Sequence, residues 1–426
     1  MEPRRLGAEG GLTPSFVRPF LYALNRMQAN EVLRPSQYMD RSRSILMDRL
    51  GAAGGQPITT FSRGCVGVIA DHTHYFKGFA LVLRLQQGLA VSMRHHQGSR
   101  SRLVVEGVAD VIQFDMSDTE QSGFAKLLAC LFEASGIERG FQVDISIVGA
   151  IPTGLGAAFH AACAVGFLDA LHRVAAATAS NGLSIEEPSF DSESFRTQLR
   201  EQSVKGLTSW YGHRFSPAFV IGTLASEDMD SFILVDTGTF EFLPVEVESS
   251  NRPGWAILEA SHDWTKPMKA SQGRFKAATK ALAELQKKAF PNVDSLRDLE
   301  HRDLDQAVGS VGRKSRPVLK HLVSENRNVQ KMVLALRKGD WQFFGALMLI
   351  SQASKRQDWD TSGELHDLVT RTAESASLDG IFGVVQTGEG GCMLVAGQPF
   401  SLPSFLDSLR EATASHTTEE IETFII

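Results

Sequence analysis

A glycine-containing turn is the stretch of this sequence best suited to binding chemistry. A segment of alternating character at residues 141–148 precedes it, and a helix-forming run rich in Ala, Leu and Val at 161–177 follows it. A strand, a glycine turn and a helix in this order point free backbone N–H groups at an anion. Proline suits such a turn, and glycines let the backbone come close to a ligand. An ordinary strand-to-helix turn would also explain the two glycines. The turn residues are Pro152, Gly154, Leu155 and Gly156.

The composition is that of an ordinary globular protein. The chain has 426 residues, 43% of them hydrophobic and 22% charged, which is enough for two or three units with cores of their own. Its net charge of −6 provides no basic surface for nucleic acid. The most apolar run, residues 155–171, is interrupted by His160 and Asp169 and is too short and too polar to span a bilayer. We therefore expect neither a nucleic-acid partner nor a membrane.

The cysteines and the N-terminus bear on the compartment. The four cysteines lie far apart, and no pair has metal-finger or redox spacing, which suits a reducing environment. Residues 1–5 lead into no apolar core, so a secretory signal is not expected. We therefore expect a cytoplasmic protein.

The residue patterns divide the chain into three parts. Residues 1–55 are expected to form an accessory arm with short helices at 16–21 and 42–50, and this arm is a possible site for a protein partner. Residues 56–230 are expected to form a first, β-rich lobe that contains the glycine turn, and residues 231–426 a second lobe.

Strands and helices are expected throughout both lobes. In the first lobe the expected strands are 58–62, 66–69, 79–83, 89–93, 102–105 and 111–114. The expected helices there are 123–135 and 195–205. In the second lobe the expected strands are 231–235, 240–245, 255–259, 381–385 and 393–396. Its expected helices are 271–289, 302–311, 317–338, 340–353, 362–376 and 403–412.

Several stretches resemble a known family. The helical stretch from His321 to Val369 is similar, in the order and spacing of its residues, to the C-terminal half of galactokinases. Residues 62–75 resemble the galactokinase signature, the glycine turn resembles the phosphate loop of the wider GHMP small-molecule kinases, and residues 387–392 resemble their third, glycine-rich motif. The resemblance covers roughly residues 58–412. It implies an α+β fold of the GHMP-kinase type, with two lobes and a ligand cleft between them.

The resemblance also implies an activity and a set of site residues. The activity is ATP-dependent phosphorylation of a sugar or sugar-like molecule, with ATP and Mg²⁺ as cofactors; no metal ligand can be named. The nucleotide-binding positions would be Pro152, Gly154, Leu155, Gly156 and His160. The substrate-binding positions would be Asp71, His72, His74, Tyr75, Gly388 and Gly390. The candidates for catalysis are Asp71, His72, His74 and His213.

The sequence departs from the family pattern at several of these positions. The signature arginine falls on Cys65, and the acidic residue that orients the sugar falls on His74. The serine run of the phosphate loop, one member of which helps to hold Mg²⁺, falls on residues 158–160, which are Ala, Phe and His. The segment that would carry the catalytic aspartate, residues 210–216, has no carboxylate. In the third motif, Glu389 places an anion where phosphates would pass.

These departures leave three functional hypotheses. Phosphoryl transfer depends on positioning and on charge neutralisation, and a general base typically contributes ~10²–10⁴-fold. The leading hypothesis, by resemblance, is a sugar kinase with an altered site. The second is a catalytically inactive sensor of a sugar or nucleotide. The third is a repurposed enzyme that uses cleft histidines for acid–base or metal chemistry; for His160 and His213 the alternative is a plain loop residue.

Overall fold

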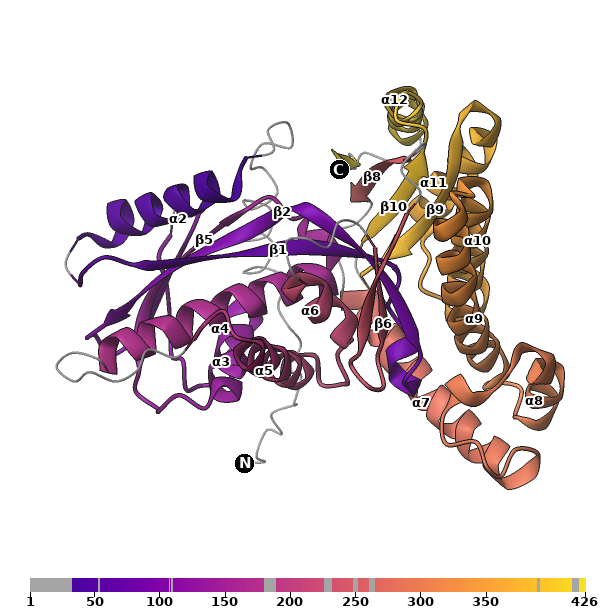
Figure 1. The fold of residues 1–426 in the computed structure, drawn as a ribbon, viewed down its shortest axis with the longest axis horizontal. Coiled ribbons are helices and arrows are strands. Elements are labelled where there is room, and N and C mark those ends of the chain that lie inside the picture. Colours follow the sequence, from indigo (N-terminus) through magenta and orange to yellow (C-terminus); the bar gives the residue numbers. More distant parts are fainter. Residues whose placement is uncertain are drawn as a thin grey trace, which may run out of the picture.

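The computed structural model describes most of the chain as two lobes, each built on one β-sheet (Figure 1). The described residues are 33–52, 54–106, 108, 110–179, 189–225, 232–247, 252–259, 265–388, 391–415 and 421–426. Residues 180–188 and the outer part of the N-terminal arm, residues 1–32, lie outside them, as do Glu389 and Gly390.

The first sheet has seven strands in the order β4-β3-β5-β2-β6-β7, with β1 paired to β2. The strands are β1 (Ile58–Ile69), β2 (Phe79–His96), β3 (Ser101–Val105), β4 (Ile112–Phe114), β5 (Gln142–Gly149), β6 (Phe232–Asp236) and β7 (Phe242–Val245). We predicted two strands within β1 and two within β2. Each pair is instead one long strand: between the pairs Arg63–Gly88 and Cys65–Arg84 the ladder changes register, and neither strand turns there.

The expected boundary between the lobes was wrong for one hairpin. The two strands predicted around residues 236–238 do form a hairpin, β6 and β7. However, β6 pairs with β2 and so extends the first sheet, although we had assigned it to the second lobe. A strand's local pattern does not reveal its partner, since pairing is decided by long-range packing.

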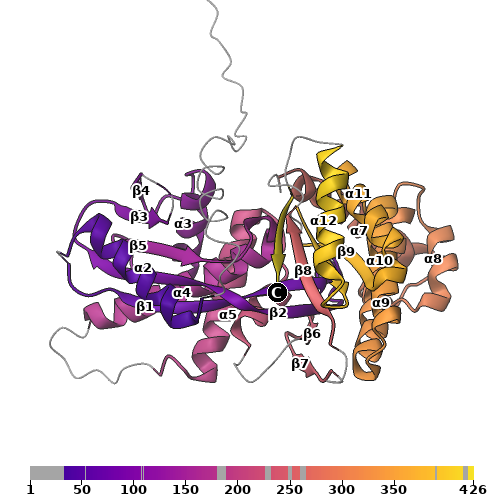
Figure 2. The same cartoon turned by 90° about the horizontal axis from the view of Figure 1, so that it is seen from above.

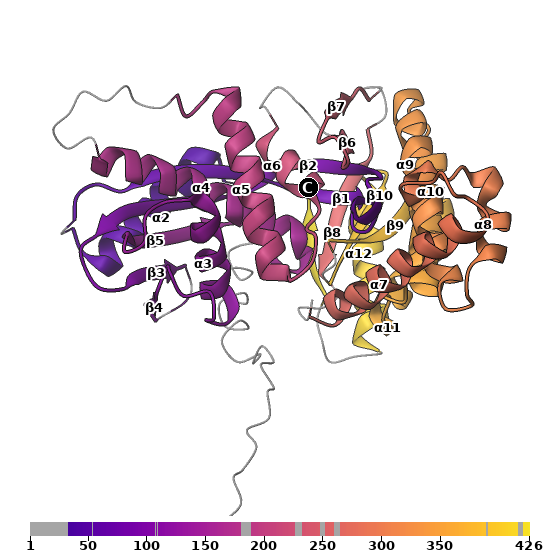
Figure 3. The ribbon, with the colours of Figure 1, turned by 90° about the horizontal axis from the view of Figure 1, so that it is seen from below.

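Helices cover both faces of the first sheet (Figures 1 and 3). Helix α2 (Pro35–Leu50) packs on β2 and β5 and buries Tyr38, Ser42 and Leu46. This part of the expected accessory arm is therefore integral to the first lobe. The helices on the other face are α3 (Gly123–Ser135), α4 (Ala157–Ala179), α5 (Glu193–Tyr211) and α6 (Pro217–Leu224). Among the described helices, only α4 is long and apolar enough to cross a bilayer. Of its most apolar 18-residue segment, 61% is buried inside the protein.

The second lobe is built on a sheet of four strands in the order β11-β8-β10-β9. Its strands are β8 (Gly254–Glu259), β9 (Ile381–Thr387), β10 (Cys392–Gly397) and β11 (Glu422–Ile425). One face packs on α11 (Glu364–Ser375) and α12 (Leu402–Ala414), whose apolar residues share a core with the sheet. The remaining helices are α7 (Thr265–Lys288), α8 (Leu304–Ser310), α9 (Arg316–Lys338) and α10 (Trp341–Ser354). Figure 2 places α8 at the outer end of this lobe.

Two irregular turns lie where the lobes meet. A short 3-10 helix, η1 (Thr73–Phe76), follows β1 and buries all of its residues. A π-helical turn, η6 (Lys355–Trp359), continues α10 and buries Lys355 and Trp359, its first and last residues. Because a π turn is wider than an α turn and recurs at functional sites, it changes which side chains face inward. The apolar core of this region joins Tyr75 and Trp359 to residues of α7, α8 and α9.

Candidate functional site

The glycine turn has the expected conformation. After β5, a short 3-10 turn over Thr153–Leu155 ends at Gly156, which has φ +55° and ψ −108°, and α4 begins at Ala157. A positive φ is the reason that glycine is needed at position 156. All residues from Ile151 to Leu168 are buried. Four of the predicted nucleotide-binding residues are therefore together in one turn and the fifth, His160, lies in α4, but none of them is exposed.

The third glycine motif lies directly on this turn. The backbone N–H of Ala157, the first of α4, donates a hydrogen bond to the carbonyl oxygen of Gly388 at 2.8 Å. Gly388 has φ +78°, and a Cβ added to it would overlap the carbonyl of Leu155. The first N–H groups of a helix are those that bind an anion. Here a backbone carbonyl occupies that position at Ala157.

A buried carboxylate lies on the other side of the turn. Glu259 ends strand β8 and is 1% exposed, and Thr153 Oγ1 donates to its Oε1 at 3.5 Å. A Cβ added to Gly154 would overlap the Glu259 carboxylate. Gly154 is thus required by contact with a side chain of the second lobe. The same carboxylate would repel a phosphate group brought to the turn.

The signature acid Asp71 is held by a buried ion pair. Lys355 Nζ donates to Asp71 Oδ2 at 2.6 Å, and the backbone N–H of Gly388 donates to Asp71 Oδ1 at 2.9 Å. The Lys355 side chain is 2% exposed and that of Asp71 is 4% exposed. Lys355 also donates to the carbonyl of Gln386. Asp71 therefore links β1 to η6 and to the third glycine motif, and each of its oxygens accepts a hydrogen bond.

His72 belongs to a buried hydrogen-bonded chain. Its Nδ1 lies 3.0 Å from Nε2 of His321, and His321 Nδ1 lies 2.9 Å from Ser354 Oγ. The His72 ring stacks on Trp359 with a centroid distance of 4.2 Å. Burial, followed by the neighbouring His321 and Lys355, lowers the pKa of His72 well below its usual value. His72 is therefore a neutral imidazole at pH 7.

His74 and His213 both contact Tyr75 and the same backbone carbonyl. His74 Nε2 donates to the carbonyl of Arg214 at 3.0 Å, and His213 Nδ1 donates to the same oxygen at 3.2 Å. The ring centroids of His74 and His213 lie 4.1 Å and 6.0 Å from that of Tyr75. Burial lowers the pKa of His74 to about 3 and also lowers the pKa of His213. The structure thus brings together the predicted catalytic histidines, in neutral form.

His160 lies in the core beneath the turn. It is 2% exposed, and its Nδ1 lies 2.8 Å from the hydroxyl of Tyr211. Its ring meets Trp210 edge to face at 4.6 Å, and burial lowers its pKa to about 3. This side chain is packed among aromatic residues, as is Phe215 at 2% exposure. Tyr211, at 5% exposure, is likewise part of this core.

No metal site is apparent among these groups. Within the described ranges, no three His, Cys, Asp or Glu side chains are placed so that they could hold a metal ion. The structure has pockets of about 250, 730 and 480 Å³, and none of their lining residues is one of the predicted site residues. Gly390, predicted to bind substrate, lies outside the described residues.

Three side chains of the site were not predicted from the sequence: Lys355, Glu259 and His321. Lys355 follows an apolar helix, and its charge gave no sign that it would point inward. Glu259 ends a strand whose other residues are apolar apart from the initial glycine, a position at which a charged residue is usually solvated. His321 is fully buried on α9 within an apolar stripe, which was the one available signal.

The chain is similar in sequence to galactokinases. No protein-family model matches it. It is 24% identical over 354 residues to the galactokinase of Lactococcus lactis subsp. cremoris, covering 78% of this chain and 81% of that protein. It is 26% identical over 369 residues to the galactokinase of Clostridium acetobutylicum, covering 82% and 87%.

The fold is similar to those of solved small-molecule kinases. The structure of Lactococcus lactis galactokinase complexed with galactose matches with a TM-score of 0.72 and 19% identity, over 92% of this chain and 97% of that one. Methanococcus jannaschii mevalonate kinase matches with a TM-score of 0.55 and 12% identity, over 87% and 98%. Streptococcus pneumoniae phosphomevalonate kinase, solved with phosphomevalonate and AMPPNP, gives 0.54 and 12%.

The likeness to solved structures defines the fold. The two-lobed fold is that of the GHMP kinases, as the sequence resemblance predicted. In sequence the chain is similar to galactokinases over most of its length.

Proposed function

We propose that this chain is a non-catalytic galactokinase homologue, a sugar-kinase fold in which the nucleotide loop is closed by the protein itself. The observation that carries the proposal is the continuous contact from Ala157 to Gly388, from Gly388 to Asp71, and from Asp71 to Lys355. The likeness to galactokinases supports a sugar kinase as the function of the class. The contacts at the turn favour a protein that has kept the fold without the reaction.

ATP and Mg²⁺ do not fit the residues present at this turn. A nucleotide phosphate would have to displace the Gly388 carbonyl from Ala157 and approach Glu259. Two unit charges ~5 Å apart repel by roughly 3 kcal/mol at an effective dielectric constant near 20, and more in drier surroundings. Ala158 and Phe159 supply no hydroxyl for a metal ion. We therefore derive no reaction step through nucleotide or metal.

Among the described residues, the segment expected to hold the catalytic base does not supply one. Deprotonation of a sugar hydroxyl needs a group within hydrogen-bond reach that can accept the proton. The segment at 210–216 has no carboxylate, and Phe215 there is buried. The carboxylate of Asp71 is bonded to Lys355 and Gly388. These contacts disfavour an ordinary sugar kinase.

Histidine chemistry receives less support than the non-catalytic role. His74 and His160 are each 2% exposed, so a substrate would reach either ring only after the surrounding side chains moved. Their lowered pKa values leave them neutral and poor at accepting a proton near pH 7.

A sensor or scaffold role fits the remaining features. Helix α2 is packed on the first lobe, so a partner contact through the N-terminal arm would fall to residues 1–32, which lie outside the described residues. All four cysteines are buried as free thiols, which favours a reducing, cytoplasmic compartment. A sugar-like molecule stays the ligand that the resemblance suggests.

Isothermal titration with ATP, with and without Mg²⁺, tests the proposal. We expect no saturable binding at the glycine turn and no phosphate transfer to galactose or a panel of hexoses. Lactococcus lactis galactokinase, assayed in parallel, is the matched positive control. Phosphate transfer above the rate of a no-enzyme control, or ATP binding that is lost on Gly154→Asp, would overturn the proposal.

A further inference from the structure

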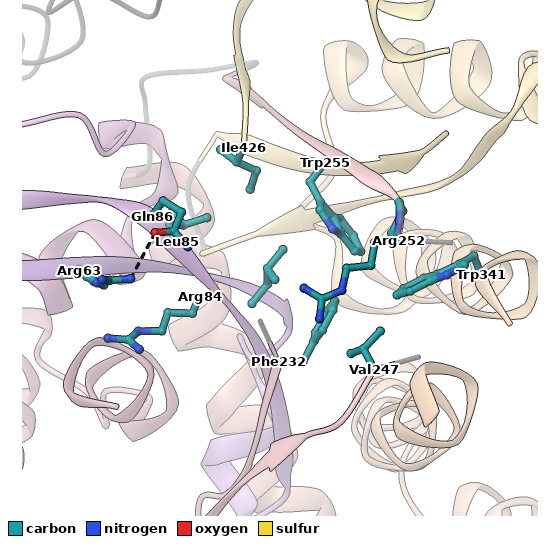
Figure 4. Close-up of a pocket in the computed structure, with 12 residues that line it drawn as sticks. Arg63, Arg84, Leu85, Gln86, Phe232, Val247, Arg252, Trp255, Trp341 and Ile426 are labelled. Carbon is teal, nitrogen blue, oxygen red and sulfur yellow. Dashed lines mark hydrogen bonds between the residues drawn. The ribbon is translucent and has the colours of Figure 1, made fainter. Parts of the chain in front are cut away.

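A pocket of about 250 Å³ lies where the first sheet meets the second sheet (Figure 4). Its walls come from β1, β2 and β6 of the first sheet and from β8 and α10 of the second lobe, and Ile426 contributes at one side. None of these residues is part of the glycine turn or of the buried histidine cluster. The pocket is therefore a separate feature of the molecule.

The apolar side of the pocket is a cluster of aromatic rings. The ring centroids of Phe232 and Trp255 lie 5.6 Å apart, and those of Trp255 and Trp341 lie 6.3 Å apart. Phe344 supports the cluster at 5.8 Å from Phe232 and 5.7 Å from Trp341. Rings fixed in this way present flat apolar faces that lose little entropy when a ligand packs on them.

One polar atom in this cluster has no partner within the part of the chain that the structure describes. Trp341 is 6% exposed, and its indole Nε1 is buried without a hydrogen bond there. A buried N–H donor without an acceptor costs free energy, so it requires an explanation. Trp341 lines the pocket, and an acceptor on a bound molecule would supply the missing bond once the atoms that cover Nε1 move aside.

Two arginines approach the pocket from opposite sides. Figure 4 shows Arg252 extending toward its middle beside Trp255 and Trp341, and Arg63 on the far side, where it donates to Gln86 Oε1 at 3.3 Å. Arg84 also lines the pocket, but its guanidinium is turned away. Among the described residues that line the pocket there are three arginines and no Asp or Glu.

The irregularity in the β1–β2 ladder shapes this wall. Arg63 pairs with Gly88, but Cys65, two residues on, pairs with Arg84, so β2 has extra residues at this point. Such bulges re-aim side chains and occur next to binding sites. Cys65 faces α6, where its sulfur contacts the carbonyl of Phe219. Arg63 is left on the side of the strand that meets the second lobe.

We propose that this pocket binds a small phosphomonoester that carries a flat ring. Guanidinium groups match phosphate oxygens with paired hydrogen bonds and also stack on aromatic faces. A dianionic phosphate would lie between Arg63 and Arg252, and the ring would pack on Trp255 and Phe232. The Nε1 of Trp341 would donate to an oxygen of the ligand. The proposal does not rest on the state of the glycine turn.

Phenyl phosphate is the probe for this inference. Inorganic phosphate and phenol, which represent its two halves, are the comparison ligands. Tryptophan fluorescence and isothermal titration of the full chain report binding, because two tryptophans line the pocket. We expect saturable binding of phenyl phosphate that is at least about 10-fold tighter than that of either half. Arg252→Gln and Arg63→Gln should each weaken binding by about 10-fold or more, the effect of losing a charged hydrogen bond.

Two further variants complete the test. Arg302→Gln removes an equal charge from an exposed position beside α8 and should leave the affinity unchanged. Trp341→Phe keeps a ring but removes the N–H, and should weaken binding several-fold with the circular dichroism unchanged. Absence of saturable binding at about 10 mM, equal binding of phenol, or an equal loss in Arg302→Gln would overturn the proposal. Binding of ATP in the glycine turn would overturn only the proposed function, since the two sites share no residue.

Discussion

The buried pair between Asp71 and Lys355 allows a quantitative test of how the site is closed. Each side chain is at most 4% exposed, and the two charged atoms are 2.6 Å apart. Lys355→Met would leave a carboxylate in the core with only the N–H of Gly388 as a donor. Removing one partner of such a pair typically destabilises a protein by about 3–5 kcal/mol. This is a large part of a total stability of about 5–15 kcal/mol.

The double variant separates the pair from its individual members. In Asp71→Asn combined with Lys355→Met neither charge of the pair remains, and replacing a buried pair in this way is often neutral or stabilising. We therefore expect each single variant to lose about 3 kcal/mol or more and the double variant to lose about 1 kcal/mol or less. The two substitutions should thus be strongly non-additive.

Urea unfolding followed by tryptophan fluorescence measures these free energies. Lys320→Met is the matched control, because Lys320 is 57% exposed and lies 3.9 Å from Asp358. An exposed pair of that kind contributes at most about 1 kcal/mol. Hydrogen exchange at Gly388 gives a second readout, since its amide donates to Asp71. Additive losses in the double variant, or a loss in Lys355→Met no larger than that in Lys320→Met, would refute the reasoning.

Two other predictions follow from the glycine turn and the buried histidines. Gly388→Ala should unfold at lower urea than Gly55→Ala: both positions have a positive φ, which costs about 1–2 kcal/mol, but only Gly388 meets a backbone carbonyl. Equal midpoints would contradict this. The pKa values of His74 and His160 are about 3, so below pH 6.5 only the unfolded chain takes up their protons. The contribution of each histidine to the free energy of unfolding should be complete above that pH and fall by about 1 kcal/mol between pH 7 and pH 5.5. Urea titrations at both pH values should show a smaller fall for His160→Gln than for the unaltered protein. An equal fall in the two proteins would contradict the prediction.

Local patterns were sufficient to predict many elements of this fold. Helix α3 begins and ends at the predicted residues, because Gly136 provides the left-handed cap that ends it. The helices expected at 317–338 and 340–353 place a joint at Gly339, and α9 and α10 are separated there. Gly339 has φ +63°, and Asp340 caps α10 by accepting from the backbone N–H of Phe343 at 2.9 Å. Such signals depend only on neighbouring residues, so they can be read without a structure.

Long-range pairing could not be predicted in the same way. The hairpin of β6 and β7 was recognised, but its place in the first sheet depends on contacts with β2, some 150 residues earlier. The continuity of β2 depends on its having three neighbours: β1, β5 and β6. A polar interruption such as Gln86-Gln87-Gly88 favours a turn unless those partners are present.

The glycines of the turn show why a motif alone does not establish a function. Gly154 is needed because the Glu259 carboxylate lies where a Cβ would be, and Gly388 because it contacts the carbonyl of Leu155. In a phosphate loop, glycines serve the close approach of a ligand to the backbone. Here the same residue type serves the close approach of one lobe to the other. Glycine is found in the sequence for either reason, and only the neighbouring group in the fold shows which reason applies. Here the neighbouring groups Glu259 and Gly388 come from the second lobe, and their local sequence gives no sign of the contact.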